Sequence, residues 1–300
     1  MSTKVKPKIL AYIVALLTVL VWGETFVSSK ILLGHGLRPA DIFAYRFGIA
    51  YLGMWLISRN NIFCKNWKDE LKMLLLGITG GSLYFLTENS ALEYSTASNV
   101  AIILCATPLA TSFLMALFFK DERMKRSQFV GSFIAILGLV LIIFNGEVVL
   151  KLNPLGDNLA LGAVLCWGSY SVLMKFVTGR YDTAFITRKV FGYGLLTIVP
   201  YFAVCGWPWN AGTGAGAGSM VTEPVVWGNL LYLGIVASLV CFLAWNWALR
   251  ELGTVRTTNL LYLQPFFTMV IGYLLLGERI TWMAVAGVII LIAGVYRVVR

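Results

Sequence analysis

The chain has 300 residues, of which 59% are hydrophobic and only 13% are charged, and its mean hydropathy is +0.80. Soluble domains are about 45–50% apolar and about 25% charged, so this composition excludes an ordinary cytosolic enzyme. A soluble globule of this make-up would expose too much apolar surface, and we therefore predict an integral membrane protein whose net charge of +10 has to be explained by its placement.

Ten apolar stretches follow one another along the chain, separated by short polar breaks. Each approaches the ~20 residues that a helix needs to cross ~30 Å of hydrocarbon. They lack the alternation of a transmembrane barrel, so we predict an all-α fold. Arg46 interrupts the second stretch, and Arg188 and Lys189 interrupt the seventh. The predicted spans are residues 9–33, 40–58, 72–93, 97–119, 128–145, 155–177, 183–205, 226–249, 255–276 and 280–297.

Basic residues gather in every second break between these spans. Three lysines precede the first span, and further basic residues follow the second, fourth, sixth, eighth and tenth. The alternate breaks hold little beyond Arg38, Lys151 and Arg279. This is the positive-inside pattern, which predicts that both termini lie on the cytoplasmic side of the cell (inner) membrane. The basic charge therefore reflects membrane topology, and no nucleic-acid partner is expected.

The sequence contains no recognisable machinery for enzymatic chemistry. Its five cysteines are scattered, mostly within apolar spans, and are predicted to be small buried hydrophobic residues. His35 is the only histidine, which excludes a multi-histidine metal site. HExxH, GxSxG and ATP-binding motifs are absent from the sequence. We therefore expect no catalytic residues, no metal and no cofactor.

The second half of the chain repeats the first. A shift of 145 residues carries Trp22 onto Trp167, together with the glycine that follows each of them. A shift of 157 residues aligns the third and fourth spans with the eighth and ninth. Pairs related by this second shift are Phe85 and Phe242, Asn89 and Asn246, and Pro108 and Pro265.

Each half holds five spans, which is an odd number, so the second half must enter the membrane upside down relative to the first. We predict two inverted five-helix repeats, at residues 1–146 and 147–300. Inverted repeats are typical of secondary transporters, because two similar halves of opposite orientation can open a site between them to either side of the membrane in turn.

The same residues resemble a known family. The Trp-Gly pairs, the two mid-span prolines, Glu122 and Glu278 after the proline-bearing spans, and the glycine-rich closing helices look like the two EamA repeats of the drug/metabolite transporter superfamily. The resemblance covers nearly the whole chain. It implies an exporter-like fold in which spans 1–4 and 6–9 surround a central cavity while spans 5 and 10 lie outside as support. It implies no particular substrate, because the relatives move amino acids, drugs, purines, sugars and other metabolites.

Ionisable side chains within the apolar spans are the main candidates for function, because each costs about 2.5–3.5 kcal/mol at the bilayer centre. Glu24, Arg46 and Glu88 are the clearest cases, and helical rise places all three at a similar depth. We hypothesise that Glu24, with Glu88 as second candidate, binds a proton or the ammonium group of a substrate. The alternative is that Arg46 only neutralises one glutamate and joins spans 1 to 3.

Other candidates carry polar or aromatic side chains close to the predicted cavity. Tyr84 lies on the same face of span 3 as Glu88. Trp22 and Trp167 would either stack on a ligand or serve as ordinary core residues. The remaining polar candidates, which would line the cavity or form packing hydrogen bonds between helices, are Asn89, Asn99, Asn246 and Gln264.

Prolines and glycines mark structural features of the spans. Pro108 and Pro265 lie in mid-span, where a missing backbone N–H predicts a bend that would serve as a hinge. Glycines seven residues apart give spans 5 and 10 a small-residue face, which predicts close helix packing first and a homodimer contact second. These glycines are Gly131, Gly138, Gly287 and Gly294.

These features predict a secondary active transporter of small organic metabolites, such as amino acids or amphipathic amines. Export by alternating access is the favoured mode, with a proton as the candidate coupling ion. The alternative is a transporter or exchanger of sugars, nucleotide-linked sugars or other metabolites without proton coupling; Arg46 and Arg188 would suit that cargo, whereas Glu24 and Glu88 argue against it. The expected partners are a small-molecule substrate and the lipid bilayer.

Overall fold

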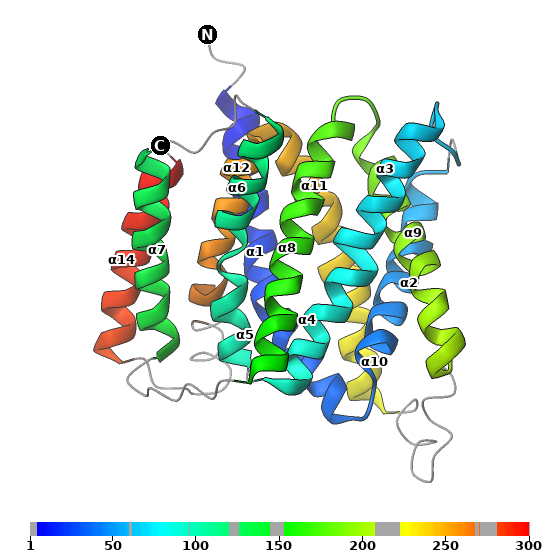
Figure 1. Cartoon of the computed structure of the whole chain (residues 1–300), viewed down its shortest axis with the longest axis horizontal. Helices are drawn as coiled ribbons and strands as arrows, with labels where there is room; N and C mark the ends of the chain where they lie inside the picture. The colour runs from blue at the N-terminus through cyan, green and yellow to red at the C-terminus, as the bar shows by residue number, and fades with distance from the viewer. Residues whose placement is uncertain are drawn as a thin grey trace.

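The computed structural model of the chain describes residues 5–59, 62–95, 97–119, 126–144, 153–207, 223–267, 270 and 281–299. The fold is all-α, with ten helices in two halves of five, several of them broken into shorter pieces (Figure 1). The first half consists of α1 (Val5–Gly34), α2 (Pro39–Ile57), α3 (Trp67–Gly77) with η1 (Ile78–Ser82) and α4 (Leu83–Tyr94), α5 (Ala97–Leu104) with α6 (Thr107–Phe118), and α7 (Arg126–Phe144). The second half consists of α8 (Pro154–Val177), α9 (Thr183–Cys205), α10 (Pro224–Leu231) with η5 (Tyr232–Val240) and α11 (Cys241–Leu252), α12 (Thr254–Asn259) with η6 (Leu260–Leu263), and α14 (Trp282–Val299).

Within the described ranges, four helices are long and apolar enough to cross a membrane: Lys8–Gly34, Pro39–Ile57, Pro154–Val177 and Pro224–Leu252. The second span is among them although it contains Arg46, so the protein is a multi-pass membrane protein as predicted. Helix α9 is not among them, because Arg188 and Lys189 lie in its first turns. The remaining predicted spans are broken or shorter.

Short polar side chains fix where several of the helices begin. The side chain of Asn66 accepts a hydrogen bond from the backbone N–H of Asp69 at the start of α3. Asn153 accepts from two backbone N–H groups at the start of α8, and Asp182 accepts from Ala184 at the start of α9. These caps satisfy N–H groups that have no partner within the helix, so the breaks between apolar stretches also set the helix boundaries.

The third span of each half contains a π-helical segment at the same place in the repeat, η1 in the first half and η5 in the second. The glycines related by the shift of 157 residues, Gly77 and Gly234, allow close crossings there. Gly77 lies against Tyr193 of α9, and Gly234 lies against Ile49 of α2, with no space for a Cβ atom at either glycine. The third span of each half therefore packs on the second helix of the other half.

Contacts at one membrane face show that the two halves are inverted. The Nζ atom of Lys30, near the end of α1, lies 3.4 Å from the carbonyl oxygen of Ser95. The side chain of Asn153, at the start of α8, donates a hydrogen bond of 2.8 Å to the carbonyl of Tyr94. Helix α1 thus ends at the face where α8 begins, and these two corresponding helices run in opposite directions. Both ends of the chain lie at the opposite face (Figure 1).

The two mid-span prolines coincide with breaks in the helices. The fourth span is interrupted at Cys105 and Ala106, and Pro108 lies in the first turn of α6. In the second half, the tighter 3-10 helix η6 ends directly before Gln264 and Pro265. Each proline lacks the N–H that would continue the preceding turn, which accounts for both breaks. The movement of these segments as hinges stays a prediction.

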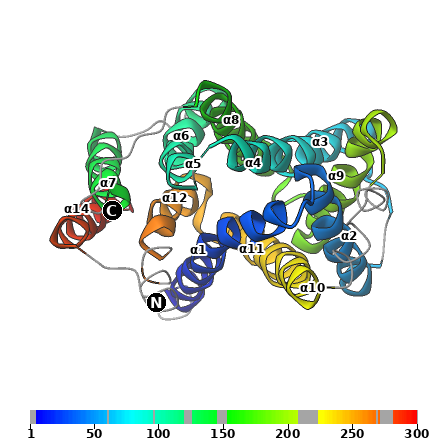
Figure 2. The same cartoon turned by 90° about the horizontal axis from the view of Figure 1, so that it is seen from below.

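Helices α7 and α14 form a separate pair at one end of the bundle (Figure 2). Their glycines face one another, Gly131 opposite Gly294 and Gly138 opposite Gly287, and the backbones are too close for a Cβ atom at any of the four. The small-residue faces are thus occupied within one chain, as expected for close helix packing. This removes the observation that suggested a homodimer through the fifth or tenth helix.

Candidate functional site

A cavity of about 40 Å³ lies between the two halves of the bundle. Helices α1, α2, α4, α5 and α6 line it from the first half, and α8, α11 and η6 line it from the second. Its size leaves room for a few water molecules. None of its described lining residues comes from α7 or α14. The lining residues are Trp22, Thr25, Phe26, Arg46, Tyr84, Phe85, Glu88, Ala101, Leu104, Cys105, Thr107, Trp167, Phe242, Leu261, Gln264 and Pro265.

Glu88 is the acidic group of this cavity. It lies on α4 and is 7% exposed. Its Oε1 atom accepts a hydrogen bond of 2.7 Å from the hydroxyl of Tyr84. Residues four apart on a helix lie on one face, so α4 presents both groups to the cavity. The hydroxyl supplies one of the donors that a carboxylate needs when it is removed from water.

Arg46 is the basic group of the same cavity. It lies on α2 and is 3% exposed. Its Nε atom donates a hydrogen bond of 2.5 Å to Oγ of Ser238, and its guanidinium carbon lies 4.3 Å from the centre of the Phe85 ring. Both contacts offset part of the cost of burying the charge.

Arg46 and Glu88 attract one another electrostatically. Over the described residues, however, no hydrogen bond or ion pair within 4 Å joins them. A guanidinium has five N–H groups and a carboxylate accepts on two oxygens, so each group keeps hydrogen-bonding capacity beyond the contacts described. The cavity therefore presents one positive and one negative group with capacity to bind a ligand.

Aromatic rings form much of the cavity wall. The ring centre of Trp22 lies 5.3 Å from that of Trp167 and 5.0 Å from that of Trp245. Nε1 of Trp22 donates a hydrogen bond of 2.9 Å to the carbonyl of Ala237, and the carbonyl of Trp22 accepts one of 3.1 Å from Gln264. Nε1 of Trp167 has no hydrogen-bond partner in the part of the chain that the structure describes. The structure thus brings Trp22, Trp167 and Gln264 together at one cavity.

Glu24 is not among the residues that line this cavity, although Arg46 and Glu88 are. It lies two positions after Trp22, and side chains two positions apart on a helix point to nearly opposite sides. Glu24 is half-buried on α1 and interacts electrostatically with Tyr232 of η5, which also interacts with Arg46. Equal depth in the membrane did not imply a shared face.

The three candidate asparagines have different surroundings. Asn246 accepts a hydrogen bond of 2.6 Å from Tyr170 and donates one of 3.0 Å to Thr187, so it joins three helices of the second half. Its repeat counterpart Asn89 is fully buried outside the cavity lining, and its side-chain atoms have no hydrogen-bond partner among the residues described. Asn99 belongs to α5, and its side chain lies outside the described part of the structure.

Three residues at the site, Ser238, Phe85 and Phe242, were not predicted from the sequence as site residues. The two phenylalanines are related by the shift of 157 residues, and their ring centres lie 6.3 Å apart at the cavity. The repeat itself therefore carried the signal for this pair. Ser238 carried none, because its contact with Arg46 depends on how α2 crosses η5.

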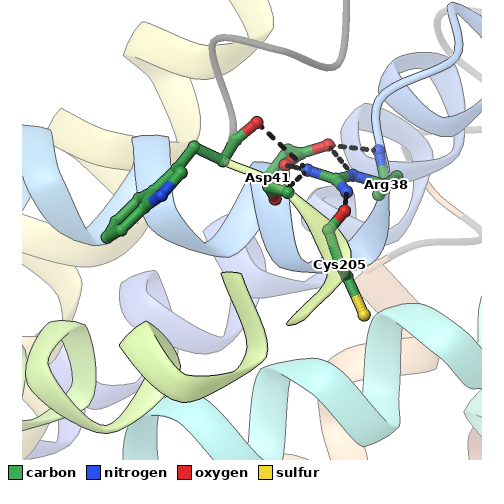
Figure 3. A network of polar contacts seen from close by, with 5 residues as sticks. Arg38, Asp41 and Cys205 are labelled. Carbon is green, nitrogen blue, oxygen red and sulfur yellow. Dashed lines mark hydrogen bonds and ion pairs between the residues drawn. The ribbon is translucent and has the colours of Figure 1, made fainter. Parts of the chain in front are cut away.

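Polar contacts join the two halves at the membrane face that lies opposite the termini. Arg38 forms a 2.7 Å ion pair with Asp41 at the start of α2 (Figure 3). It also donates hydrogen bonds to the carbonyls of Cys205 and Gly206, at the end of α9. Asp41 is fully buried. The hydrogen bond from Arg38 to Asp41 holds the pKa of Arg38 above its usual range, against the lowering effect of burial.

A second set of polar contacts joins the halves at the face that carries the termini. Asp69, in the first turn of α3, accepts hydrogen bonds from Lys72 (2.7 Å) and from the hydroxyl of Tyr181 (3.0 Å), and it lies 3.6 Å from Arg180. The hydrogen bond from Lys72 is the largest influence on the carboxyl and contributes to lowering the pKa of Asp69 to about 2. Asp69 is therefore ionised at any physiological pH.

Glu70 forms an ion pair with Lys189, one of the two cations in the seventh span. Lys189 and Tyr193, both of α9, donate hydrogen bonds to its Oε1 atom. Burial would raise the pKa of Glu70, but these hydrogen bonds outweigh it and lower the pKa to about 2. Arg188 donates to the carbonyl of Ser58 instead. Neither Arg188 nor Lys189 lines the central cavity.

A bundle of apolar helices, built from two inverted halves around a small central cavity, is an architecture that membrane transporters use. The chain belongs to the EamA-like transporter family, whose sequence profile matches residues 9–144 and 154–300. It is therefore a transporter and not an enzyme.

Three proteins illustrate the similarity. An "Uncharacterized transporter" of Archaeoglobus fulgidus is 28% identical over 93% of this chain and 94% of its own length. A protein of Escherichia coli named "Probable amino-acid metabolite efflux pump" is 26% identical over 95% of this chain and 93% of its own. A crystal structure matches 96% of this chain and 97% of its own with a TM-score of 0.72 and 16% identity, which shows the fold alone.

Proposed function

We propose that the protein exports small amino-acid-like metabolites or amphipathic amines by alternating access. The observation that carries this proposal is the presence of both Glu88 and Arg46 in one cavity with an aromatic wall, between the two halves. A zwitterion carries one charge for each of these groups. The name of the Escherichia coli relative, an amino-acid metabolite efflux pump, supports the same substrate class and direction.

Recognition of such a substrate follows from the chemistry of the cavity. The ammonium group binds the carboxylate of Glu88 and lies against the faces of the aromatic rings, which attract cations. A substrate carboxylate binds the N–H groups of Arg46 that face the cavity, for which a guanidinium has the matching fork geometry. Amines that lack a carboxylate use the first contact alone. An apolar side chain of the substrate lies against Trp22 and Trp167.

Transport requires the two halves to separate around the substrate, because about 40 Å³ is too small for an amino acid. The Arg38 contacts close one face and the Asp69 and Glu70 contacts close the other. Breaking one set while the other holds would expose the cavity to one side at a time. The residues that line the cavity would thereby meet each side of the membrane in turn.

Coupling to a proton is part of the proposal, with Glu88 as the group that exchanges a proton for the substrate ammonium. Tyr84 orients this carboxylate toward the cavity. Glu24 is the second candidate, and its place beside Tyr232 would make any coupling through it indirect. Phosphorylated or nucleotide-linked sugars are less favoured as cargo, because Arg46 is the one cation among the described lining residues and Glu88 opposes its charge.

The membrane orientation belongs to the same proposal. Both termini lie at one face, and the sequence places the excess of basic residues at the breaks on that side. The positive-inside pattern then puts both termini in the cytoplasm of the cell, with the Arg38 contacts on the outside. A protease-accessibility assay on cells tests it directly: cleavage of an N-terminal tag from outside the cell would contradict it.

Counterflow in proteoliposomes tests the function. Vesicles loaded with an unlabelled amino acid, a cationic amine or a sugar are assayed for uptake of the labelled compound at two pH values. We expect amino acids or amines to exchange and sugars not to exchange. Glu88→Gln should abolish this exchange, whereas Glu93→Gln, an exposed position on the same helix, should leave it unchanged. Exchange of sugars alone, or full exchange by Glu88→Gln, would contradict the proposal.

A further inference from the structure

A large polar pocket opens at the membrane face that carries the termini, away from the central cavity. Its volume is about 740 Å³, within the range that holds small organic molecules. The end of α2, the segment that follows it, and the turn between α8 and α9 form its walls. It therefore lies between the two halves, at the level where the helices leave the membrane.

The pocket is strongly basic. Three cations line it, Arg59, Lys65 and Arg180, against a single acid among the described lining residues, Asp182. The carboxylate of Asp182 is already engaged with the backbone N–H of Ala184 at the start of α9. Arg180 lies 3.6 Å from Asp69. Arg59 and Lys65 are exposed to the pocket, and the net charge suits an anionic ligand.

The wall of the pocket is held in place by the contacts between the halves. The hydroxyl of Tyr181 accepts a hydrogen bond of 3.2 Å from the backbone N–H of Lys65 and donates one of 3.0 Å to Asp69. These bonds join the segment after α2 to the turn between α8 and α9. The pocket is therefore a cavity whose wall is held by hydrogen bonds, and it differs in this from a patch of lysines on an open surface.

A mainly apolar groove of about 260 Å³, whose lining also includes Arg188 and Lys189, adjoins the pocket along the side of the bundle, between α2 and α9. Phe63 lines both spaces and is 73% exposed. Trp55, Ile62 and Leu196 line the groove and are also exposed on the outer surface. In a membrane this surface faces lipid chains. A basic pocket and an apolar groove therefore meet at one aromatic side chain, at the depth where headgroups give way to hydrocarbon.

We propose that this pocket and groove bind an anionic phospholipid, with its phosphate at Arg59, Lys65 and Arg180 and one acyl chain passing Phe63 into the groove. Charge complementarity selects the phosphate, because basic pockets at the cytoplasmic side of membrane helices attract anionic headgroups. The adjoining groove selects a lipid over a free anion, because a free anion would leave it empty. The bound lipid bridges α2 of the first half and α9 of the second.

The test is native mass spectrometry of the full-length protein in detergent, titrated with phosphatidylglycerol or with phosphatidylcholine of the same chains. We expect retained phosphatidylglycerol adducts and few phosphatidylcholine adducts. Arg59→Gln combined with Lys65→Gln should weaken phosphatidylglycerol binding by about fivefold for each cation removed. Lys8→Gln combined with Arg256→Gln removes the same charge from exposed positions outside the pocket and should leave the binding unchanged.

A charge-conserving variant guards against misfolding as an explanation. Arg59→Lys combined with Lys65→Arg should retain phosphatidylglycerol binding, and all variants should show the thermal unfolding of the unmodified protein. A phosphatidylglycerol with a photoreactive acyl chain should label the peptides that contain Ile62, Phe63 and Leu196. Equal binding by the glutamine variant and its control, equal retention of both lipids, or competition by inorganic phosphate at the concentration of the lipid would overturn the proposal.

Discussion

The hydroxyl of Tyr84 donates a 2.7 Å hydrogen bond to Oε1 of Glu88, one turn further along α4, so that the acid of the central cavity is held by a neighbour from its own helix. Arg46, the opposite charge, comes from a different helix and is held from the other half by Ser238. Each charge is therefore positioned separately, and a substrate does not have to break an ion pair to reach them.

Replacing Tyr84 tests this positioning. Tyr84→Phe removes one hydrogen bond to a charged group, which is worth about 1.5–3 kcal/mol, so we expect substrate exchange to fall by roughly tenfold or more. Tyr94→Phe changes an exposed tyrosine at the end of the same helix and serves as the control. Counterflow rates in proteoliposomes measure both variants. Wild-type exchange by Tyr84→Phe would show that Glu88 needs no such support.

Glu24 and Glu88 should respond differently to the same substitution. Because Glu24 is not among the residues that line the cavity, Glu24→Gln should change substrate affinity by no more than about twofold, the range expected for a site outside direct contact. Glu88→Gln should lose binding. Isothermal titration with the substrate identified by counterflow separates the two. A large loss of affinity in Glu24→Gln would place its carboxylate at the cavity in another conformation of the transporter.

Gly77 should tolerate no side chain. A Cβ atom there would meet Tyr193 and lie 2.8 Å from the backbone nitrogen of Gly194, so Gly77→Ala should destabilise the protein by about 1–3 kcal/mol. Gly48, also helical, has nothing within 4 Å of the added atom. Gly48→Ala should therefore be neutral or slightly stabilising. Thermal unfolding in detergent compares them, and equal melting temperatures would argue against the close crossing of α3 and α9.

The lowered pKa of Asp69 predicts that the folded protein loses stability in acid. Its pKa is about 2 in the folded protein against an ordinary value of 3.8, so its ionised form stabilises the fold above about pH 4, and this contribution is lost as the pH falls toward 2. The difference in melting temperature between the unmodified protein and Asp69→Asn should be constant from pH 7 to pH 5 and shrink below pH 4. A difference that persists unchanged at pH 2.5 would contradict this origin.

Much of the architecture could be predicted from the sequence, because apolar length, charge placement and internal repetition all depend on local patterns. The π-helical segments could not be predicted, because they differ from an α-helix only in hydrogen-bond register. The surroundings of Glu24 could not be predicted either, for a related reason. Helical rise gives the depth of a residue, whereas the direction of its side chain depends on which neighbours pack against the helix.

The cations of the seventh span show a second limit. Arg188 was expected to suit an anionic cargo together with Arg46, yet it donates a hydrogen bond to the carbonyl of Ser58, and its neighbour Lys189 pairs with Glu70. Equivalent positions in two duplicated halves start with similar surroundings. As the two sequences diverge, the residues at these positions acquire different partners. Trp22 and Trp167, which the repeat relates, both line the central cavity, whereas Arg188 does not.

The glycine contacts between α7 and α14 have a consequence for how the molecule can move. Each half ends in one of these two helices, and their backbones touch along Gly131, Gly138, Gly287 and Gly294. We expect this contact between α7 and α14 to hold one edge of the molecule closed in every conformation. The largest relative movement of the two halves would then occur at the far edge, where α2 and α9 meet.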